Sequence, residues 1–402
     1  MILALILPAP TIEVVYNTYM EAEGIVTPKI FNIDGTDLIV DNSSLHKTLT
    51  MTSTFNLELM DRHYHKMPKT QYLGSKERLV RWLYDNSPKD INVFFDAFSG
   101  TSVVGHYFKN KGKKVIANDF LKFNYHIGKA LIENNKVTLT ERDIKLLLSK
   151  NNKADNLIER TFTNVFFERD QAQFLDNFRA NVELLNNQYK KSLALTIMNR
   201  SLTRKVLLGH FAHLSALRYS RDPARIKRNP TIARPIKDLF LELVPDYNKA
   251  VFSNSQKNKV YCENTTGLIS KLRGVDLVYF DPPYYGRHPD YQAFYHFLET
   301  FVEYWNDKEF VNGTKQYFPK KQSGFVKQKE VVSSFKKLFA ASTHIPYWLI
   351  SYNSKSYPTE DIMIDLIKNH KKVKVVHHEY QNHYGGKGSR QGTKEYLFFC
   401  YD

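Results

Sequence analysis

The chain has 402 residues, of which 42% are hydrophobic and 24% are charged, a globular composition that leaves room for about two or three domains. Its 57 Lys and Arg against 41 Asp and Glu give a formal net charge of +16, which indicates a polyanionic partner such as nucleic acid, although a basic surface without such a partner has the same charge. Only two cysteines occur, Cys262 and Cys400, which excludes a disulfide framework or a cysteine zinc site and is typical of the reducing cytoplasm.

Residues 1–66 form an N-terminal extension in which we find no interpretable motif. The extension begins with the apolar stretch MILALILPAP, which lacks the basic segment of a signal peptide and is too short to cross a bilayer. No other apolar run approaches about 18 residues. We therefore expect a soluble, cytoplasmic protein without a membrane partner, and the role of the extension stays open.

Residues 67–135 have the alternation of a parallel α/β sheet. The stretch QYLGSKERLVRWL predicts a turn and an amphipathic helix, and NVFFDAFSGTSVVGHYFKNKG predicts a strand, a turn of small residues and a helix. The stretch KKVIANDF follows as a second strand that ends in an acid. This β-α-β order implies parallel strands joined by a right-handed crossover.

Residues 136–257 are polar and favour helices, and their second half is strongly basic. Between Arg200 and Leu239 the chain carries ten Lys and Arg residues but only two acids, and three prolines divide it into loops. Clustered cations can neutralise phosphates and arginine can read guanine edges, so we expect DNA contact here, with a solvated surface as the alternative. The candidate contact residues are Arg200, Arg204, Lys205, Arg218, Arg221, Arg225, Lys227 and Arg228.

Residues 258–402 return to the alternation of strands and helices. The stretches NKVYCENTTGLI and VDLVYFDPPY predict strands, and YQAFYHFLETFVEYW predicts a helix with apolar residues at helical spacing. The remaining predicted strands are YWLISYNS, KVKVVHHEY and KEYLFFCYD.

Two strands of the first segment end in acids, at the edge where open α/β sheets bind ligands. Asp96 precedes a small-residue turn at Gly100, which allows close approach to the backbone and leads into a helix N-terminus. Asp119 ends the next strand, about 20 residues beyond that turn, and is placed to accept hydrogen bonds from ribose hydroxyls. A tight strand-to-helix turn and a helix N-cap are the structural alternatives.

A third strand ends in Asp281, Pro282, Pro283 and Tyr284. The prolines fix the backbone, so the Asp281 carboxylate and the Pro282 carbonyl provide two converging acceptors, which suit an NH₂ group with its two donors. The ring of Tyr284 can lie flat against a planar base. The residues therefore predict a clamp for the exocyclic amine of an aromatic base, and a turn with a solvated Asp is the structural alternative.

The stretches YLGSK, DAFSGTS, ND and DPPY occur in the order seen in DNA N6-adenine methyltransferases of the alpha, or D12, class, which this sequence resembles. The resemblance extends to YHFLET and ISYNS, covers about residues 70–135 and 258–402, and is most specific at DPPY. It implies a Rossmann-like α/β methyltransferase sheet, mostly parallel. Its cofactor-binding half would be residues 67–135, its inserted DNA target-recognition domain residues 136–257, and its catalytic half residues 258–402.

The resemblance also implies roles for individual residues. Asp119 would bind the ribose of S-adenosylmethionine, and Asn264 stands where the family often has an Asp near the cofactor adenine. Ser102 replaces a frequent glycine of the turn, which could crowd it slightly. The other implied cofactor-binding residues are Tyr72, Gly74 and Lys76 near the methionine part and Asp96, Phe98 and Gly100 around the cofactor, with Phe98 near its adenine.

The implied reaction is methyl transfer to N6 of an adenine flipped out of double-stranded DNA. Asp281, Pro282, Pro283 and Tyr284 would form the catalytic clamp, and no metal is required. We expect a monomer that modifies a specific site, as the partner of a restriction endonuclease. The alternatives are an N4-cytosine DNA methylase, an RNA adenine methylase, or a non-catalytic nucleic-acid-binding protein that keeps a relic cofactor fold.

Overall fold

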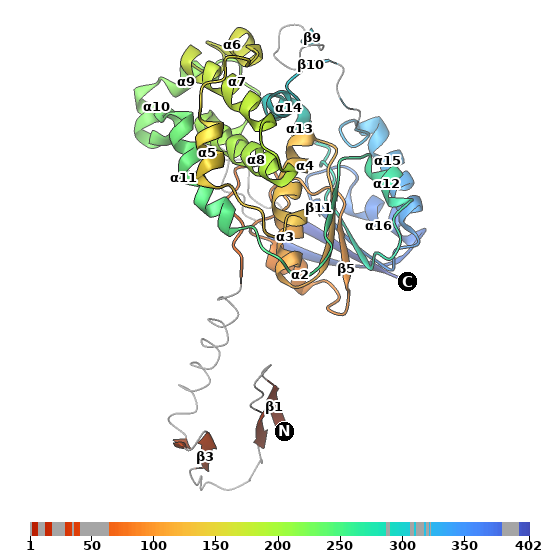
Figure 1. The fold of residues 1–402 in the computed structure, drawn as a ribbon. Coiled ribbons are helices and arrows are strands. Elements are labelled where there is room, and N and C mark those ends of the chain that lie inside the picture. The colour runs from red at the N-terminus through yellow and green to blue at the C-terminus, as the bar shows by residue number, and fades with distance from the viewer. Residues whose placement is uncertain are drawn as a thin grey trace. The chain divides into compact units, whose positions relative to one another are not determined.

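The computed structural model divides the chain into two compact units, Met1–Tyr64 and His65–Asp402. It describes the backbone of residues 2–6, 13–17, 29–33, 36–40 and 317–318, and the complete residues 64–286, 290–305, 309–310, 321, 323–379 and 394–402 apart from the Leu207 side chain. Most of the extension predicted at residues 1–66 lies outside these described residues. Figure 1 shows the elements of both units.

The described part of the first unit consists of two short antiparallel hairpins. Strand β1 (Ile2–Ile6) pairs with β2 (Glu13–Asn17), and β3 (Lys29–Ile33) pairs with β4 (Thr36–Val40).

A seven-stranded sheet organises the second unit and confirms the predicted mostly parallel α/β fold. Its strand order is β12-β13-β11-β8-β5-β6-β7. Strands β11, β8, β5, β6 and β7 are parallel, whereas β13 is antiparallel to β11 and to β12. The bounds are β5 (Val93–Asp96), β6 (Lys114–Asn118), β7 (Lys259–Tyr261), β8 (Leu277–Phe280), β11 (Tyr347–Asn353), β12 (Lys372–Glu379) and β13 (Lys394–Tyr401).

The order in which the chain adds strands to the sheet changes direction beside β5. From β5 the chain continues outward to β6 and β7, and it then returns to place β8 on the other side of β5. Such a switch point leaves a crevice at the carboxyl ends of the two central strands, where open α/β sheets bind ligands. Asp96 ends β5 and Asp281 directly follows β8, so both acids lie at this crevice.

The two faces of the sheet are covered by separate hydrophobic cores. Alternate residues of β8 divide between them, with Leu277 and Tyr279 in one core and Val278 and Phe280 in the other. All four are buried, which is typical of a parallel strand covered on both faces and explains the unbroken apolar run in the sequence.

Helices α12, α15 and α16 contribute to the core that contains Val278 and Phe280. The other core contains side chains of α2 and α3 and of the helical region between β6 and β7. The helices outside that region are α2 (Val80–Asp85), α3 (Val103–Asn110), α12 (Thr265–Ile269), α13 (Tyr291–Phe294), α14 (His296–Glu303), α15 (Gln328–Ser342) and α16 (Glu360–Lys368). Two further strands of two residues each, β9 (Glu309–Phe310) and β10 (Tyr317–Phe318), pair antiparallel with each other.

The chain between β6 and β7 is helical, and Figure 1 shows these helices gathered beside the sheet. They share a continuous hydrophobic core with one face of the sheet. The elements are α4 (Lys122–Gly128), the π-helical turn η1 (Lys129–Glu133), α5 (Glu141–Leu147), α6 (Leu157–Phe162), α7 (Arg169–Glu183), α8 (Gln188–Lys205), the 3-10 turn η2 (Leu207–Gly209), α9 (Ala216–Ser220), α10 (Pro223–Arg228), the 3-10 turn η3 (Pro230–Ala233) and α11 (Ile236–Lys249). The domain limits at residues 136 and 257 stay a prediction.

Within the described residues, no helix combines the length and the apolar character that crossing a bilayer requires. The same part of the chain contains no group of three or more His, Cys, Asp or Glu residues arranged to hold a metal ion.

Candidate active site

One cavity of about 430 Å³ opens at the carboxyl ends of β5, β6 and β8. Its volume is within the range of sites for small molecules and cofactors. All twelve residues predicted to act in catalysis or cofactor binding line it: Tyr72, Gly74, Lys76, Asp96, Phe98, Gly100, Asp119, Asn264, Asp281, Pro282, Pro283 and Tyr284. Residues separated by more than 200 positions in the sequence therefore meet in one place.

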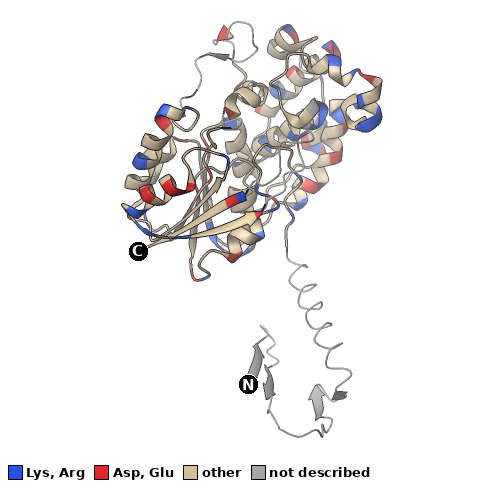
Figure 2. Ribbon diagram, turned by 180° about the vertical axis from the view of Figure 1, so that it is seen from behind, with Lys and Arg blue, Asp and Glu red and all other residues tan. Residues whose placement is uncertain are grey.

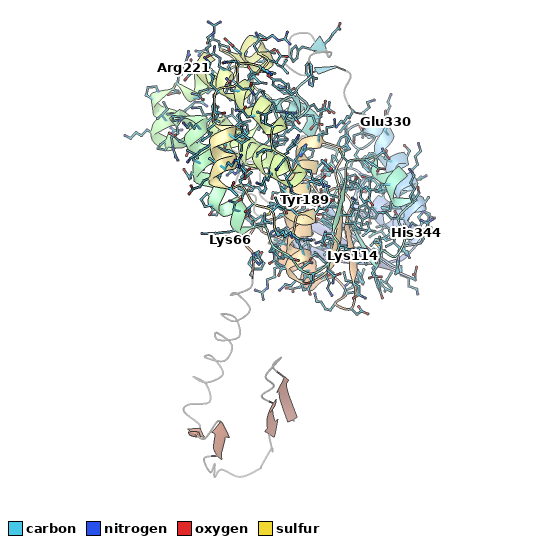
Figure 3. All side chains as sticks on the ribbon, in the orientation of Figure 1. Lys66, Lys114, Tyr189, Arg221, Glu330 and His344 are labelled. Atoms are coloured by element: carbon cyan, nitrogen blue, oxygen red, sulfur yellow. The ribbon has the colours of Figure 1, made fainter. Side chains whose placement is uncertain are left out.

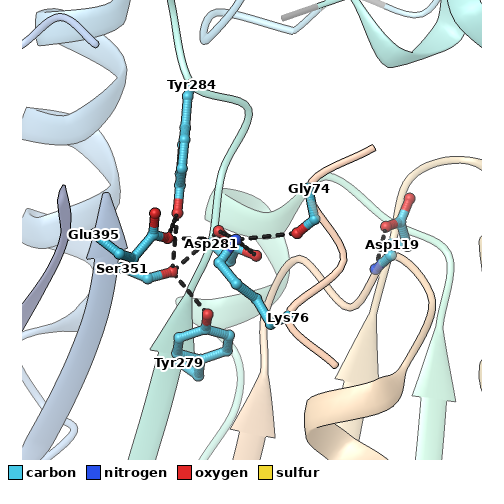
Figure 4. Close-up of polar contacts among 9 residues, drawn as sticks. Gly74, Lys76, Asp119, Tyr279, Asp281, Tyr284, Ser351 and Glu395 are labelled. Carbon is cyan, nitrogen blue, oxygen red and sulfur yellow. Dashed lines mark hydrogen bonds and ion pairs between the residues drawn. The ribbon is translucent and has the colours of Figure 1, made fainter. Parts of the chain in front are cut away.

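Asp281 is held by two neighbours (Figure 4). The Lys76 ammonium donates to both of its oxygens, at 2.8 Å from Oδ1 and 2.7 Å from Oδ2, and also to the Gly74 carbonyl at 3.1 Å. The Ser351 hydroxyl donates to Oδ1 at 3.0 Å. The carboxylate is thereby fixed in position at the end of its strand.

A second carboxylate, Glu395, lies close to Lys76. Its Oε1 is 3.6 Å from the Lys76 Nζ and accepts a hydrogen bond of 2.7 Å from the Tyr284 hydroxyl. Its side chain is only 5% exposed, and burial raises the pKa of Glu395 to about 7, while the nearby Lys76 opposes that rise. The Lys76 Nζ also lies 4.9 Å from the centre of the Tyr284 ring, within range of a cation–π contact.

Glu395, Ser351 and Tyr279 are parts of this polar network that sequence reasoning did not select as site residues. The Tyr279 and Ser351 hydroxyls are 2.7 Å apart, and Ser351 belongs to the ISYNS stretch that contributed to the family resemblance. Glu395 had a signal of its own, because it is a charged residue at the start of the apolar strand KEYLFFCYD. A buried acid in such a strand requires a partner, which predicts a polar site nearby.

Asp96 is buried at the end of β5 and is only partly satisfied. Its Oδ2 accepts a hydrogen bond from the Gly105 N–H at 3.1 Å in the first turn of α3, whereas its buried Oδ1 has no hydrogen-bond partner among the residues that the structure describes. Burial raises the pKa of Asp96 to about 8. A buried acceptor without a partner in a cavity wall indicates that a bound molecule supplies the donor.

Asp119 follows β6 and organises the turn beside it. Its Oδ2 accepts from the Gly100 N–H and its Oδ1 from the Leu121 N–H, both at 2.9 Å. Burial raises the pKa of Asp119 to about 6, although these hydrogen bonds oppose the rise. Each carboxylate oxygen can accept more than one hydrogen bond, so Asp119 can still bind a ligand hydroxyl.

Three further positions that the sequence analysis singled out, Ser102, Asn264 and Gly74, have particular backbone conformations or contacts around the cavity. Ser102 has a φ of 59°, a left-handed conformation that glycine adopts more readily than serine. Asn264 is the N-cap of α12, and its side chain accepts from the Gly267 N–H at 3.2 Å. Gly74 has a φ of 78°, and a Cβ there would lie 2.6 Å from the Tyr291 hydroxyl oxygen.

Aromatic rings form two walls of the cavity. Tyr72 is stacked with Tyr291 and Tyr295, at centroid distances of 5.5 and 4.6 Å. Phe98 contacts Phe325 edge to face at 5.5 Å. Planar rings that line a pocket provide surfaces against which a base or an adenine can stack.

The eight candidate DNA-contact residues do not line this cavity. They occupy α8, α9, α10 and the residue after α9, among helices where Lys and Arg recur in Figure 2. Arg218, Lys227 and Arg228 are exposed, whereas the Lys205 side chain is buried and donates to the Arg234 carbonyl at 2.7 Å.

The remaining four already have partners within the fold. Arg200 donates to the Lys69 carbonyl at 2.8 Å. Arg204 pairs with Glu242, Arg221 with Glu168 and Arg225 with Asp222. Arg221, labelled in Figure 3, lies on the helical side of the unit and holds Glu168 with two hydrogen bonds of 2.8 and 2.7 Å.

Comparison with known proteins identifies relatives over most of the chain. Residues 72–363 match the family of D12 class N6 adenine-specific DNA methyltransferases. The type II methyltransferase M2.HphI of Haemophilus parahaemolyticus is 32% identical over 340 residues, which are 83% of this chain and 97% of that protein.

Two further relatives are more distant. The type II methyltransferase M.CviAII of Paramecium bursaria Chlorella virus 1 is 24% identical over 83% of this chain and 99% of its own length. The type II methyltransferase M.FokI of Planomicrobium okeanokoites is 27% identical over 82% of this chain and 52% of its own length. These matches confirm the resemblance found in the sequence motifs. The chain belongs to the D12 class of N6 adenine-specific DNA methyltransferases.

Proposed function

We propose that this enzyme transfers a methyl group from S-adenosylmethionine to N6 of an adenine flipped out of double-stranded DNA, in the cavity at the ends of β5, β6 and β8. The observation that carries the proposal is the convergence of Asp281, Tyr284, Asp96 and Asp119 on that one cavity. The clamp for an amine and the acceptors for a cofactor are then adjacent.

The residues around the cavity fit S-adenosylmethionine. The unpartnered Oδ1 of Asp96 suits a cofactor donor, Asp119 suits the ribose hydroxyls, and Phe98 offers a face to the adenine. Tyr72, Gly74 and Lys76 would contact the methionine part, and Asn264 the adenine amine. When bound, the cofactor would supply a methyl group that is activated for transfer, because the positively charged sulfur that carries it is a good leaving group.

On the acceptor side, the chain's own residues orient the adenine. The Asp281 carboxylate and the Pro282 carbonyl accept hydrogen bonds from the two N6 hydrogens and favour a nitrogen whose lone pair is directed at the methyl group. Pro283 keeps this turn rigid, and Tyr284 stacks on the base, which offsets about 1–3 kcal/mol of the flipping cost. The proton that N6 loses passes to Asp281 and then to water. Alignment of the reacting atoms supplies most of the remaining acceleration.

The finer biological setting is also a proposal. The relatives M2.HphI and M.CviAII are named type II methyltransferases, and StsI of Streptococcus sanguinis is named a modification methylase. We infer that this enzyme protects a specific DNA site against a cognate restriction endonuclease, and that it acts as a monomer in the cytoplasm. Residues 136–257 would read the site.

Nucleoside analysis tests the reaction and the clamp together. The protein is incubated with S-adenosylmethionine and unmethylated DNA, the DNA is digested, and the nucleosides are measured by mass spectrometry. We expect N6-methyldeoxyadenosine from the native enzyme and at least about a thousandfold less from Asp281→Ala, because several kcal/mol of orientation is lost. Asp365→Ala, which changes an exposed acid of α16, is the matched control and should keep full activity.

Other products would overturn parts of the proposal. N4-methyldeoxycytidine would keep the clamp but change the base. Methylation of RNA alone would change the nucleic acid. Cofactor binding without any methylated nucleoside would favour a non-catalytic binding protein.

A further inference from the structure

The Lys76 ammonium occupies the acceptors that the target amine requires. It donates to both oxygens of Asp281, at 2.8 and 2.7 Å. The Ser351 hydroxyl donates to Oδ1 as well, so Asp281 already accepts three hydrogen bonds. Its two oxygens offer about four acceptor sites, so an adenine amine would enter a nearly filled set in which the Lys76 ammonium holds one site on each oxygen. Movement of Lys76 away from Asp281 would remove this competition.

Lys76 has little freedom to move into water. Its side chain is only 7% exposed, and a buried ammonium that loses its partner carries a large free-energy penalty. A second carboxylate is already close, because Glu395 Oε1 lies 3.6 Å from the Lys76 Nζ. A displacement of about 1 Å would bring this pair to hydrogen-bond distance.

The geometry points to Glu395 as a positioning residue that receives the Lys76 ammonium when the target amine takes Asp281. The inference deepens the proposed function and depends on it. In this exchange the ammonium stays paired throughout, while Asp281 becomes available to the base. Figure 4 shows the contacts of Lys76 with both carboxylates.

Glu395 also connects the exchange to the stacking ring. The Tyr284 hydroxyl donates to Glu395 Oε1 at 2.7 Å and lies 3.2 Å from the Ser351 Oγ. The same carboxylate therefore has two roles: it holds Tyr284 in position for the base, and it can accept the Lys76 ammonium. A Gln at this position keeps an oxygen that can accept from the Tyr284 hydroxyl but lacks the charge that attracts the ammonium, so Glu395→Gln removes the exchange and leaves Tyr284 held.

The charges around Glu395 give the exchange a pH dependence. Only the ionised carboxylate attracts the ammonium, and burial raises the pKa of Glu395 to about 7. Transfer of Lys76 to Glu395 should thus become easier as the pH rises through 7. Among the described residues, the titratable and charged groups that face Glu395 from the elements around it are Lys76, Tyr279, Asp281, Tyr284, Tyr291 and, across the β12–β13 pair, His378.

Single-turnover kinetics test the exchange with the full-length enzyme, saturating S-adenosylmethionine and DNA of a site mapped in the nucleoside assay. We expect Glu395→Gln to slow methyl transfer by roughly tenfold to a hundredfold, since a misplaced clamp costs rate, and to abolish the fall in rate below pH 7. Cofactor affinity and melting temperature should stay close to those of the native enzyme. Glu395→Asp should recover part of the rate, and Glu379→Gln, an exposed acid of β12, is the matched control.

A double variant distinguishes the exchange from a merely structural role. Once Lys76→Met has removed the ammonium, Glu395 has nothing to receive, so Lys76→Met with Glu395→Gln should be no slower than Lys76→Met alone. A double variant whose rate is lower than that of Lys76→Met by the full factor that Glu395→Gln causes alone would overturn the exchange. An unchanged rate and pH profile in Glu395→Gln would overturn it as well. In either case an active native enzyme would leave the proposed function intact, whereas an inactive native enzyme would overturn the function itself.

Discussion

Individual acids in the cavity wall and beside it have pKa values that differ from those in water. Burial raises the pKa of Asp96 to about 8, that of Glu395 to about 7 and that of Asp119 to about 6. Carboxyls at these values are partly protonated near neutral pH, which is typical of a site built to receive donors or a positive charge. The proposed sulfonium cofactor and amine substrate would supply both.

Asp96 should make the stability of the free enzyme depend on pH. Its pKa in the folded protein, about 8, is above the ordinary value of 3.8, so its protonated form stabilises the fold fully below about pH 4 and this stabilisation is lost as the pH rises through 8. Between pH 6 and pH 8 the native enzyme should lose about 1–2 kcal/mol more unfolding free energy than Asp96→Asn, which keeps an acceptor for the Gly105 N–H. Urea denaturation at several pH values measures the difference.

The Asp96→Asn comparison isolates one group, because Glu395 and Asp119 titrate in the same interval in both proteins. Equal pH slopes for the two proteins would show that Asp96 is ionised in the folded enzyme. The prediction concerns the enzyme without cofactor, since a bound donor would favour the ionised carboxylate.

At the scale of elements, helix α4 depends on an acid from a distant part of the sequence. The Glu299 carboxylate of α14 accepts from the Lys122 N–H at 2.9 Å and from the Phe123 N–H at 3.1 Å, at the N-terminus of α4. Lys321 donates to the same carboxylate at 2.6 Å. A negative group at this end of a helix satisfies free N–H donors and complements the helix dipole. Because α4 follows Asp119, this contact also supports the cavity.

Glu299→Gln should therefore destabilise the enzyme by about 2–4 kcal/mol, because Glu299 is fully buried and its loss leaves Lys321 less well paired. Cofactor affinity should fall with it. Denaturant unfolding and isothermal titration calorimetry measure the two effects. Asp365→Asn, which changes an exposed acid of α16, should change neither, and equal stability of the two variants would contradict a supporting role for Glu299.

At the scale of the whole enzyme, DNA binding should depend on exposed cations of the helical region. Of the eight candidate residues, Arg218, Arg221, Lys227 and Arg228 are exposed, and Arg221 pairs with Glu168, whereas the other three form no ion pair with any described residue. Cations without an acidic neighbour can neutralise phosphates without first breaking an internal pair. The excess of positive charge, +16 over the whole chain, would then favour DNA binding through these exposed cations rather than through the surface as a whole.

The triple variant Arg218→Ala, Lys227→Ala and Arg228→Ala tests this location. Each phosphate contact contributes about 0.9 to the slope of log affinity against log salt, so the slope should become shallower by about 2–3. Fluorescence anisotropy with a labelled duplex at several salt concentrations measures it. The matched control replaces three exposed lysines on α15 and α16, on the side of the unit that Figure 3 marks with Glu330, namely Lys336, Lys337 and Lys368. An equal change of slope in the control would show that the location is wrong.

The sequence by itself determined the reaction class and the parallel core of the sheet. Unbroken apolar runs such as the one before Asp281 reveal buried parallel strands, and acids at their ends reveal the ligand-binding edge, because both are local patterns. The helix predicted after Asp290 is interrupted at Tyr295 in the structure, a detail that depends on packing.

Only the tertiary structure decided which distant side chains complete the clamp. Lys76, Ser351 and Glu395 come from three separated segments, and nothing local in the sequence states that they meet at Asp281. The same holds for Glu299 at α4 and for the basic residues, some of which are committed to internal ion pairs. The physical reason is that strand pairing and core packing bring these segments together, whereas a sequence pattern records only neighbours along the chain.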